Sequence, residues 1–171
     1  MNLKIRLDRA SIDEAAKKLE TAAADLDRKT REICERLATI GAVRASLDYA
    51  RVPLDGPKDV TVTVEPSGNG YKVIASGETV LFLEFGSGAL YGYGHPEPGE
   101  YGPGTWPDPH YRRDPANGAI IYHWNDPQGW CIPKEKGGGH TYGNPPAMGM
   151  YNASRDIRDN IKRIVEEVLL S

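Results

Sequence analysis

At 171 residues the chain has the length of one globular domain, so we expect a single domain spanning residues 1–171. Lysine and arginine total 21 against 24 aspartates and glutamates, and the formal charge of −3 disfavours a main role in gripping DNA through its phosphates. The N-terminus lacks the apolar stretch of a signal peptide, and no window approaches the ~20 apolar residues of a membrane helix. We therefore expect assembly in the cytoplasm, where Cys34 and Cys131 stay reduced.

The first part of the chain predicts a long helix. Residues 2–9 alternate between apolar and polar side chains, as in a short strand or the lead-in to a helix. Ser11-Ile-Asp-Glu14 then has the form of a capping box. A stripe with spacings of seven, seven, seven, four and three carries the helix to about residue 48; its members are Ile12, Leu19, Leu26, Ile33, Leu37 and Ile40.

We expect this stripe to pack against a sheet or a second helix of the same chain. An intermolecular coiled coil is the alternative, disfavoured because alanine fills many flanking positions and only about four heptads are present. The prolines of Pro53-Leu-Asp-Gly-Pro57 end the helix. Residues 59–76 then predict an antiparallel hairpin, since valines and threonines alternate on both sides of a Pro-Ser-Gly-Asn-Gly turn.

Residues 79–88 are the densest apolar run, and their only charge is Glu84. We expect this run, whether helical turn or strand, to be buried on nearly every side. A carboxylate there is costly without donors, so Glu84 should reach backbone amides or an arginine. Gly86 and Gly88 should end the element, because glycine takes positive φ without steric cost.

Residues 86–146 hold 13 of the 19 glycines, 10 of the 13 prolines, all three tryptophans and all four histidines. Such a long loop is usually functional or disordered, and its aromatic content argues against disorder. Residues 120–124 and 129–132 predict a second small hairpin, and residues 89–130 an arm lying on a partner. Tyrosine and tryptophan are enriched at protein interfaces, so we assign to the interface Tyr91, Tyr93, Tyr101, Trp106, Tyr111, Trp124 and Trp130.

The loop also contains groups with catalytic or metal-binding chemistry. Its four histidines and Cys131 are spaced too widely for any compact zinc pattern, so we expect no metal; the histidines are His95, His110, His123 and His140. Cys131 with His123 or His140 could form a thiol–imidazole pair, but no catalytic cysteine signature surrounds it. We expect no catalytic residue and no cofactor.

The last segment predicts a helix that opens at Asn144-Pro145-Pro146, because asparagine is a good N-cap and proline is tolerated in the first turn. Its predicted buried face consists of Met148, Tyr151, Ile157, Ile161, Ile164, Val165 and Val168.

Two motifs in this order resemble one family. Phe82-Leu-Glu-Phe-Gly-Ser-Gly88 resembles the Y-V-E-F-G-T-G segment of the tail-component (tail-completion, or neck) proteins of long-tailed bacteriophages. Gly143-Asn-Pro-Pro-Ala-Met-Gly-Met-Tyr-Asn-Ala153 resembles the G-x-x-P-x-P-F-M-x-x-A start of that family's C-terminal helix. The resemblance implies structural positions at Glu84, Phe85, Gly86, Gly88, Gly143, Pro146, Met150 and Ala153.

Such proteins are thought to assemble as rings at the head–tail junction of the virion. The resemblance therefore implies that this chain is assembled in the host cytoplasm and contacts copies of itself and other head–tail or tail proteins. It implies no membrane and no sequence-specific nucleic acid, with DNA passing through the lumen of the ring.

We therefore predict an α+β domain in which an antiparallel sheet of about four strands is packed by a long N-terminal helix and a C-terminal helix, with a long loop rich in glycine, proline and aromatic residues. The predicted function is structural, that of a phage or prophage neck or tail-completion subunit. Two alternatives stay open. One is a small hydrolase that depends on a metal or on Cys131 and the loop histidines; the other is a carbohydrate-binding module that uses Trp106, Trp124 and Trp130.

Overall fold

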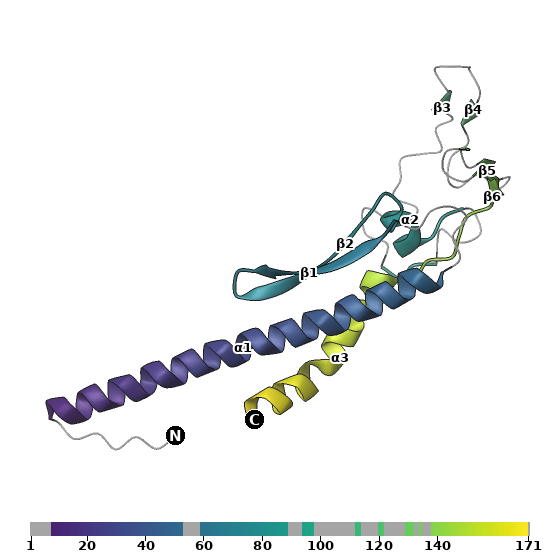
Figure 1. Cartoon of the computed structure of the whole chain (residues 1–171). Helices are drawn as coiled ribbons and strands as arrows, with labels where there is room; N and C mark the ends of the chain where they lie inside the picture. Colours follow the sequence, from purple (N-terminus) through teal and green to yellow (C-terminus); the bar gives the residue numbers. More distant parts are fainter. Residues whose placement is uncertain are drawn as a thin grey trace.

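The computed structural model of the protein describes residues 8–52, 59–88, 94–97, 112–113, 120–121, 129–131, 134 and 138–170. It is α+β, as predicted, and its main elements in chain order are α1 (Arg9–Arg51), β1 (Thr61–Ser67), β2 (Gly70–Ser76), α2 (Val80–Phe85) and α3 (Gly149–Leu170). Figure 1 shows α1 as a long rod between the β1–β2 hairpin and α3, with α2 near its C-terminal end.

The sheets differ from the prediction. The hairpin over residues 59–76 is confirmed, with Val62 opposite Ala75 and Val64 opposite Val73. A four-stranded sheet is not seen in the described residues, which form three separate two-stranded ladders. Besides β1–β2, these pair β3 (Arg112–Arg113) with β4 (Ile120–Ile121) and β5 (Trp130–Cys131) with β6 (His140–Thr141).

The predicted second hairpin is not seen in the described residues, where residues 120–121 pair with 112–113 and residues 130–131 with 140–141. Residues 122–128 of that prediction lie outside the described residues. Ladders of two residues carry almost no hydrophobic pattern, so the sequence does not specify their register or partner.

Helix α1 begins earlier than its predicted capping box. Asp8 is the N-cap, and its carboxylate accepts a hydrogen bond from the backbone N–H of Ser11 at 2.8 Å. Aspartate is at least as good an N-cap as serine, and starting the helix there adds most of a turn. The alternation of residues 2–7 lies outside the described residues.

The apolar stripe of α1 divides into two halves. Ile33, Leu37 and Ile40 are partly buried. The exposed fractions of Ile12, Leu19 and Leu26 are 50%, 55% and 58%, so the expectation of packing within the chain is wrong for this half. The reason is the length of α3, whose last turn reaches back only as far as Lys29, the Nζ of which lies 3.5 Å from the Leu169 carbonyl oxygen.

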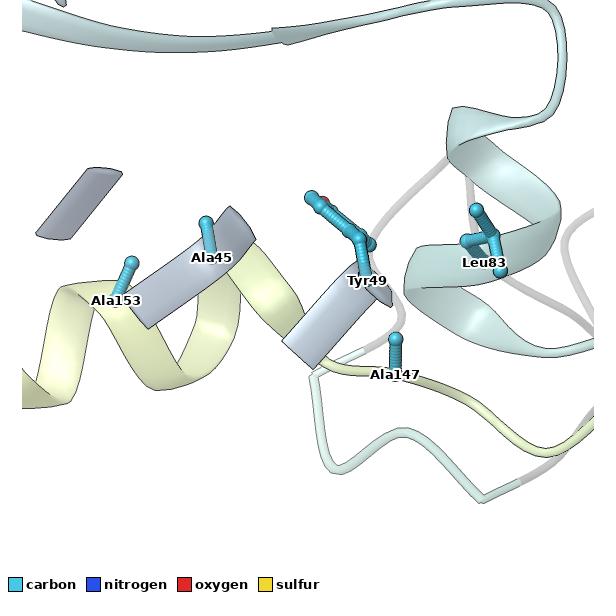
Figure 2. Packing of buried hydrophobic residues seen from close by; sticks show 5 residues of the cluster. All are labelled: Ala45, Tyr49, Leu83, Ala147 and Ala153. Carbon is cyan, nitrogen blue, oxygen red and sulfur yellow. The ribbon is translucent and has the colours of Figure 1, made fainter. Parts of the chain in front are cut away.

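The core lies where α1, α2 and α3 meet. Figure 2 shows its buried residues, which are Ala45, Tyr49, Leu83, Ala147 and Ala153. Small residues let the two long helices approach closely: a Cβ added at Gly41 would lie 2.6 Å from Ile157 Cδ1. Ile164 and Val168 are buried on α3 as predicted, whereas Ile161 is exposed.

Candidate functional site

The two motif segments, far apart in the chain, lie against each other. We call this contact the α2–α3 joint and define it as residues 82–88 together with residues 143–153. The backbones of Ser87 and Asn144 exchange two hydrogen bonds of 2.9 and 3.2 Å, and the N–H of Ala147 donates to the Leu83 carbonyl at 2.6 Å. Residues 144–148 are therefore hydrogen-bonded through their backbone to residues 83–87, and they lead directly into α3.

Glycines make this pairing possible. Gly86, Gly88 and Gly143 have φ values of 77°, 84° and 101°, so the expectation that Gly86 and Gly88 end the element with positive φ is confirmed. A Cβ on Gly86 would lie 2.8 Å from the Pro146 nitrogen. Side chains on the other two would collide with the backbones of Tyr142 and Ser87, since the two segments touch there.

Glu84 is the centre of the joint. Its Oε2 accepts hydrogen bonds from the Tyr49 hydroxyl at 2.7 Å and the Met150 N–H at 2.9 Å. Its Oε1 accepts from the Tyr151 N–H at 3.0 Å. The expectation that this buried carboxylate finds backbone amides is therefore confirmed, and the amides are those of the first turn of α3.

This arrangement caps α3 from outside the helix. The predicted start at Asn144 is wrong, because α3 begins at Gly149. The side chain of Asn144 instead donates to the Phe82 carbonyl and accepts from the Ser87 hydroxyl, which holds the end of α2. Met148 precedes the helix with φ of 54°, and its side chain has no oxygen that could accept from the first N–H groups of α3. The Glu84 carboxylate supplies that oxygen and also suits the positive end of the helix dipole.

His95 completes the surroundings of Glu84. Its Nε2 lies 3.4 Å from Glu84 Oε1, while its Nδ1 accepts from the Glu97 N–H at 3.0 Å, which places a proton on Nε2. The buried ring packs edge-on against Phe85 and Tyr151, with centroids 4.8 and 5.3 Å away. The sequence predicts an ordinary loop histidine at position 95, and no periodicity links it to Glu84.

The carboxylate is thus fully occupied. An ionised carboxylate offers about four acceptor sites, and here four donors meet its two oxygens. Burial, together with the nearby negative charge of Glu84, raises the pKa of Tyr49 far above its ordinary value. Tyr49 therefore stays a protonated donor to Glu84.

Helix α2 is anchored in the same way. Its N-cap, Thr79, makes no side-chain cap, and the carboxylate of Asp59 instead accepts from the N–H groups of Glu78 and Thr79. Asp59 also accepts from the Thr79 hydroxyl, and this bond with those from the amides lowers the pKa of Asp59. An acidic residue distant in sequence thus caps the start of each helix: Asp59 caps α2 and Glu84 caps α3.

An open pocket lies beside the joint. Its rim includes Val80, Leu81, Phe85, His95, Met150 and Tyr151. The expectation that the whole central run is buried is wrong, since Leu81 and Phe82 are each 37% exposed while Leu83 and Glu84 are buried. A helix of six residues presents only one side to the core, and the other side is left at the surface. This surface offers contact area for an apolar side chain of a partner.

Most of the predicted interface residues lie outside the described residues. These are Tyr91, Tyr93, Tyr101, Trp106, Tyr111 and Trp124. Trp130 is in β5, and only its backbone is described. Within the part of the chain that the structure describes, no three metal-ligating side chains form a group, and Cys34 and Cys131 are unbonded thiols.

One predicted pair of reactive residues lies opposite each other in a strand ladder. Cys131 and His140 face each other in the β5–β6 ladder, and both are exposed. Directly opposed residues point to the same face of such a ladder. The His140 ring packs edge-on against Tyr142, with centroids 4.8 Å apart.

Comparison of the chain with protein-family models, with curated proteins and with solved structures finds no match. In the described residues no helix has an apolar stretch long enough to span a bilayer.

Proposed function

We propose that this protein is a structural, non-enzymatic subunit of the head–tail junction or tail of a long-tailed phage or prophage, and that it assembles as a ring. One observation supports this most directly. The residues that carry the resemblance meet in the α2–α3 joint, where Glu84 caps α3 and Gly88 lies against Gly143. This supports a structural role for the residues that carry the resemblance, since four donors occupy the Glu84 carboxylate.

In this proposal the function lies in surfaces. Residues 89–130 form an arm that lies on the neighbouring subunit, apart from His95, which packs beside Glu84 of its own chain. A head-to-tail contact of this kind closes into a ring when its rotation allows. The exposed Leu81 and Phe82 beside the joint provide apolar contact area for such a neighbour. The net charge of −3 suits a lumen through which DNA passes without adhering. The subunit is assembled in the host cytoplasm and is part of the virion.

The arm can be tested without touching the joint. Because His95 packs on Glu84, the deletion must spare residues 94–97, so residues 98–111 are replaced by a short Gly-Ser linker. We expect the wild type to form a closed ring in light scattering after size exclusion. The deletion variant should lose the ring while circular dichroism shows that it stays folded. A milder variant substitutes serine for Tyr101, Trp106 and Tyr111.

Rings of unchanged mass in both arm variants would overturn the arm assignment. A wild type that stays monomeric at every concentration, and also when mixed with head–tail proteins of the same phage, would overturn the proposed function.

A second candidate function is favoured by the opposed positions of Cys131 and His140 in the β5–β6 ladder. An imidazole beside a thiol can act as the base that activates it for nucleophilic catalysis. If the pair is active, iodoacetamide should alkylate Cys131 faster than Cys34 near pH 7, and His140→Asn should remove the difference. Equal alkylation rates in the wild type and in His140→Asn would reject this function.

A further inference from the structure

The N-terminal half of α1 carries an apolar stripe without cover from α3. Ile12, Leu19 and Leu26 repeat every seven residues and are each at least half exposed. The same face of α1 packs on α3 further along the helix, where Gly41 meets Ile157. Figure 1 shows this half of α1 extending well beyond the end of α3. The exposed stripe is therefore the continuation of an established helix–helix interface.

The residues around the stripe suit a second helix at close range. If Ile12, Leu19 and Leu26 are the a positions of heptads, then Ala16 and Ala23 are e positions and Ala22 is a d position. Alanine at these places buries less apolar area than a leucine-rich seam, which counts against a long coiled coil, but it lets two backbones approach closely over a short one. The occupant must bring its own large apolar residues at the same spacing, and another copy of α1 does so.

We propose that two copies of this chain associate through the N-terminal halves of α1, packed antiparallel. The orientation follows from charge. In an antiparallel pair each g position faces a g position of the other helix, and here the exposed g residues are Lys18 and Asp25. Lys18 of each copy then lies beside Asp25 of the second copy, twice over by symmetry. A parallel pair would instead set Lys18 against Ala23 and Asp25 against Thr30, neither of which carries a charge.

The ends of the stripe fit the same register. With Lys18 beside Asp25 of the second copy, Leu19 lies opposite Ala22 and Ile12 lies opposite Lys29. Lys29 is where α3 ends, since its Nζ reaches the Leu169 carbonyl, and Leu170 there is 86% exposed. Ile12 of one copy thus meets the exposed leucines at the end of α3 of the other. This surface is separate from the α2–α3 joint and from the arm.

The test uses charge reversal in the full chain. Lys18→Asp and Asp25→Lys should each weaken the dimer roughly three- to tenfold in Kd by sedimentation equilibrium at low salt, because each creates two repulsive pairs. An equimolar mixture of the two variants should restore wild-type affinity as a heterodimer. Lys17→Asp and Glu20→Lys carry the same charge changes on the outer face of α1 and should leave Kd unchanged. Leu19→Glu should weaken the dimer at least about tenfold.

Two results would overturn the proposal: a wild type whose mass does not depend on concentration, or a mixture of Lys18→Asp and Asp25→Lys that binds no more tightly than either variant alone.

One further variant tests whether another segment of the chain covers this face instead of a second copy. Residues 1–7 precede this face, and Ala15 within it is only 8% exposed. If dimers form only after residues 2–7 are deleted, that segment and not a second copy occupies the face. The arm is intact in every variant of α1, and the arm deletion tests ring formation separately. The α1 dimer and the arm contact can therefore be disproved independently of each other.

Discussion

The two halves of α1 share one apolar period and end in opposite environments. In the C-terminal half, Ala45 and Tyr49 are buried, and Asp48 accepts from Arg44 and from Asn152 of α3, each at 2.8 Å. In the N-terminal half the described polar contacts include exposed pairs such as Lys18–Glu14, which solvent screens and which add little stability. A heptad pattern therefore predicts that a face will be covered without specifying what covers it.

What separates the halves is the α2–α3 joint. It fixes α2 and the start of α3 at one end of α1 only, and it does so through buried hydrogen bonds that need specific partners. Variants of the joint should therefore reduce the free energy of unfolding strongly, and variants of the N-terminal half should hardly change it.

The largest effect is expected at Glu84. Glu84→Ala leaves the Tyr49 hydroxyl and two amides of α3 without their acceptor, and should lower the free energy of unfolding by about 3–5 kcal/mol in urea. Glu84→Gln keeps one acceptor oxygen and should lose less. Glu166→Ala, on the exposed side of α3, is the matched control and should stay within about 0.5 kcal/mol. A loss below about 1 kcal/mol for Glu84→Ala would show that the joint does not hold α3.

Gly88→Ala should have the next largest effect. Alanine at positive φ costs about 1–2 kcal/mol, and its Cβ would also collide with the Tyr142 carbonyl, so we expect a loss of roughly 2–4 kcal/mol. Gly68 in the hairpin turn has φ of 57° and open space around it. Gly68→Ala therefore measures the conformational cost alone. Equal losses in the two variants would mean that close contact at Gly88 contributes nothing.

Tyr49→Phe should cost about 1–2 kcal/mol at neutral pH, because one hydrogen bond to Glu84 is lost from a packed site. Tyr49 also links stability to pH. Its pKa is raised in the folded state, so its contribution is complete below the unfolded pKa of about 10 and declines above it, as the unfolded tyrosine ionises and the folded one does not. The difference in unfolding free energy between wild type and Tyr49→Phe should therefore shrink between about pH 9.5 and 11. A constant difference would contradict the raised pKa.

These features were unequally visible in the sequence. The β1–β2 hairpin, the two long helices and the need of Glu84 for amide donors follow from period, turn residues and the cost of a buried charge. The identities of Tyr49 and His95 as its neighbours do not, because nothing in their spacing relates them to Glu84. The predicted start of α3 is wrong because a contact distant in sequence decides it. Asn144 has the side chain of an N-cap, but that side chain bonds to the end of α2.

The smallest effect on the free energy of unfolding is expected in the N-terminal half of α1, and it tests most directly whether the two halves differ in kind. Leu19 is 55% exposed, and glutamine has nearly the helix propensity of leucine, so Leu19→Gln should change the unfolding free energy by less than about 0.5 kcal/mol when measured well below the Kd of the dimer. Well above that concentration the wild type gains stability from association and the variant gains less, so the two unfolding curves should separate as concentration rises. Leu83→Ala, in the core, should instead lose about 2–5 kcal/mol at every concentration. A loss of more than about 1 kcal/mol for Leu19→Gln in dilute solution would show that the monomer itself covers this face, and the two halves of α1 would then differ in degree only.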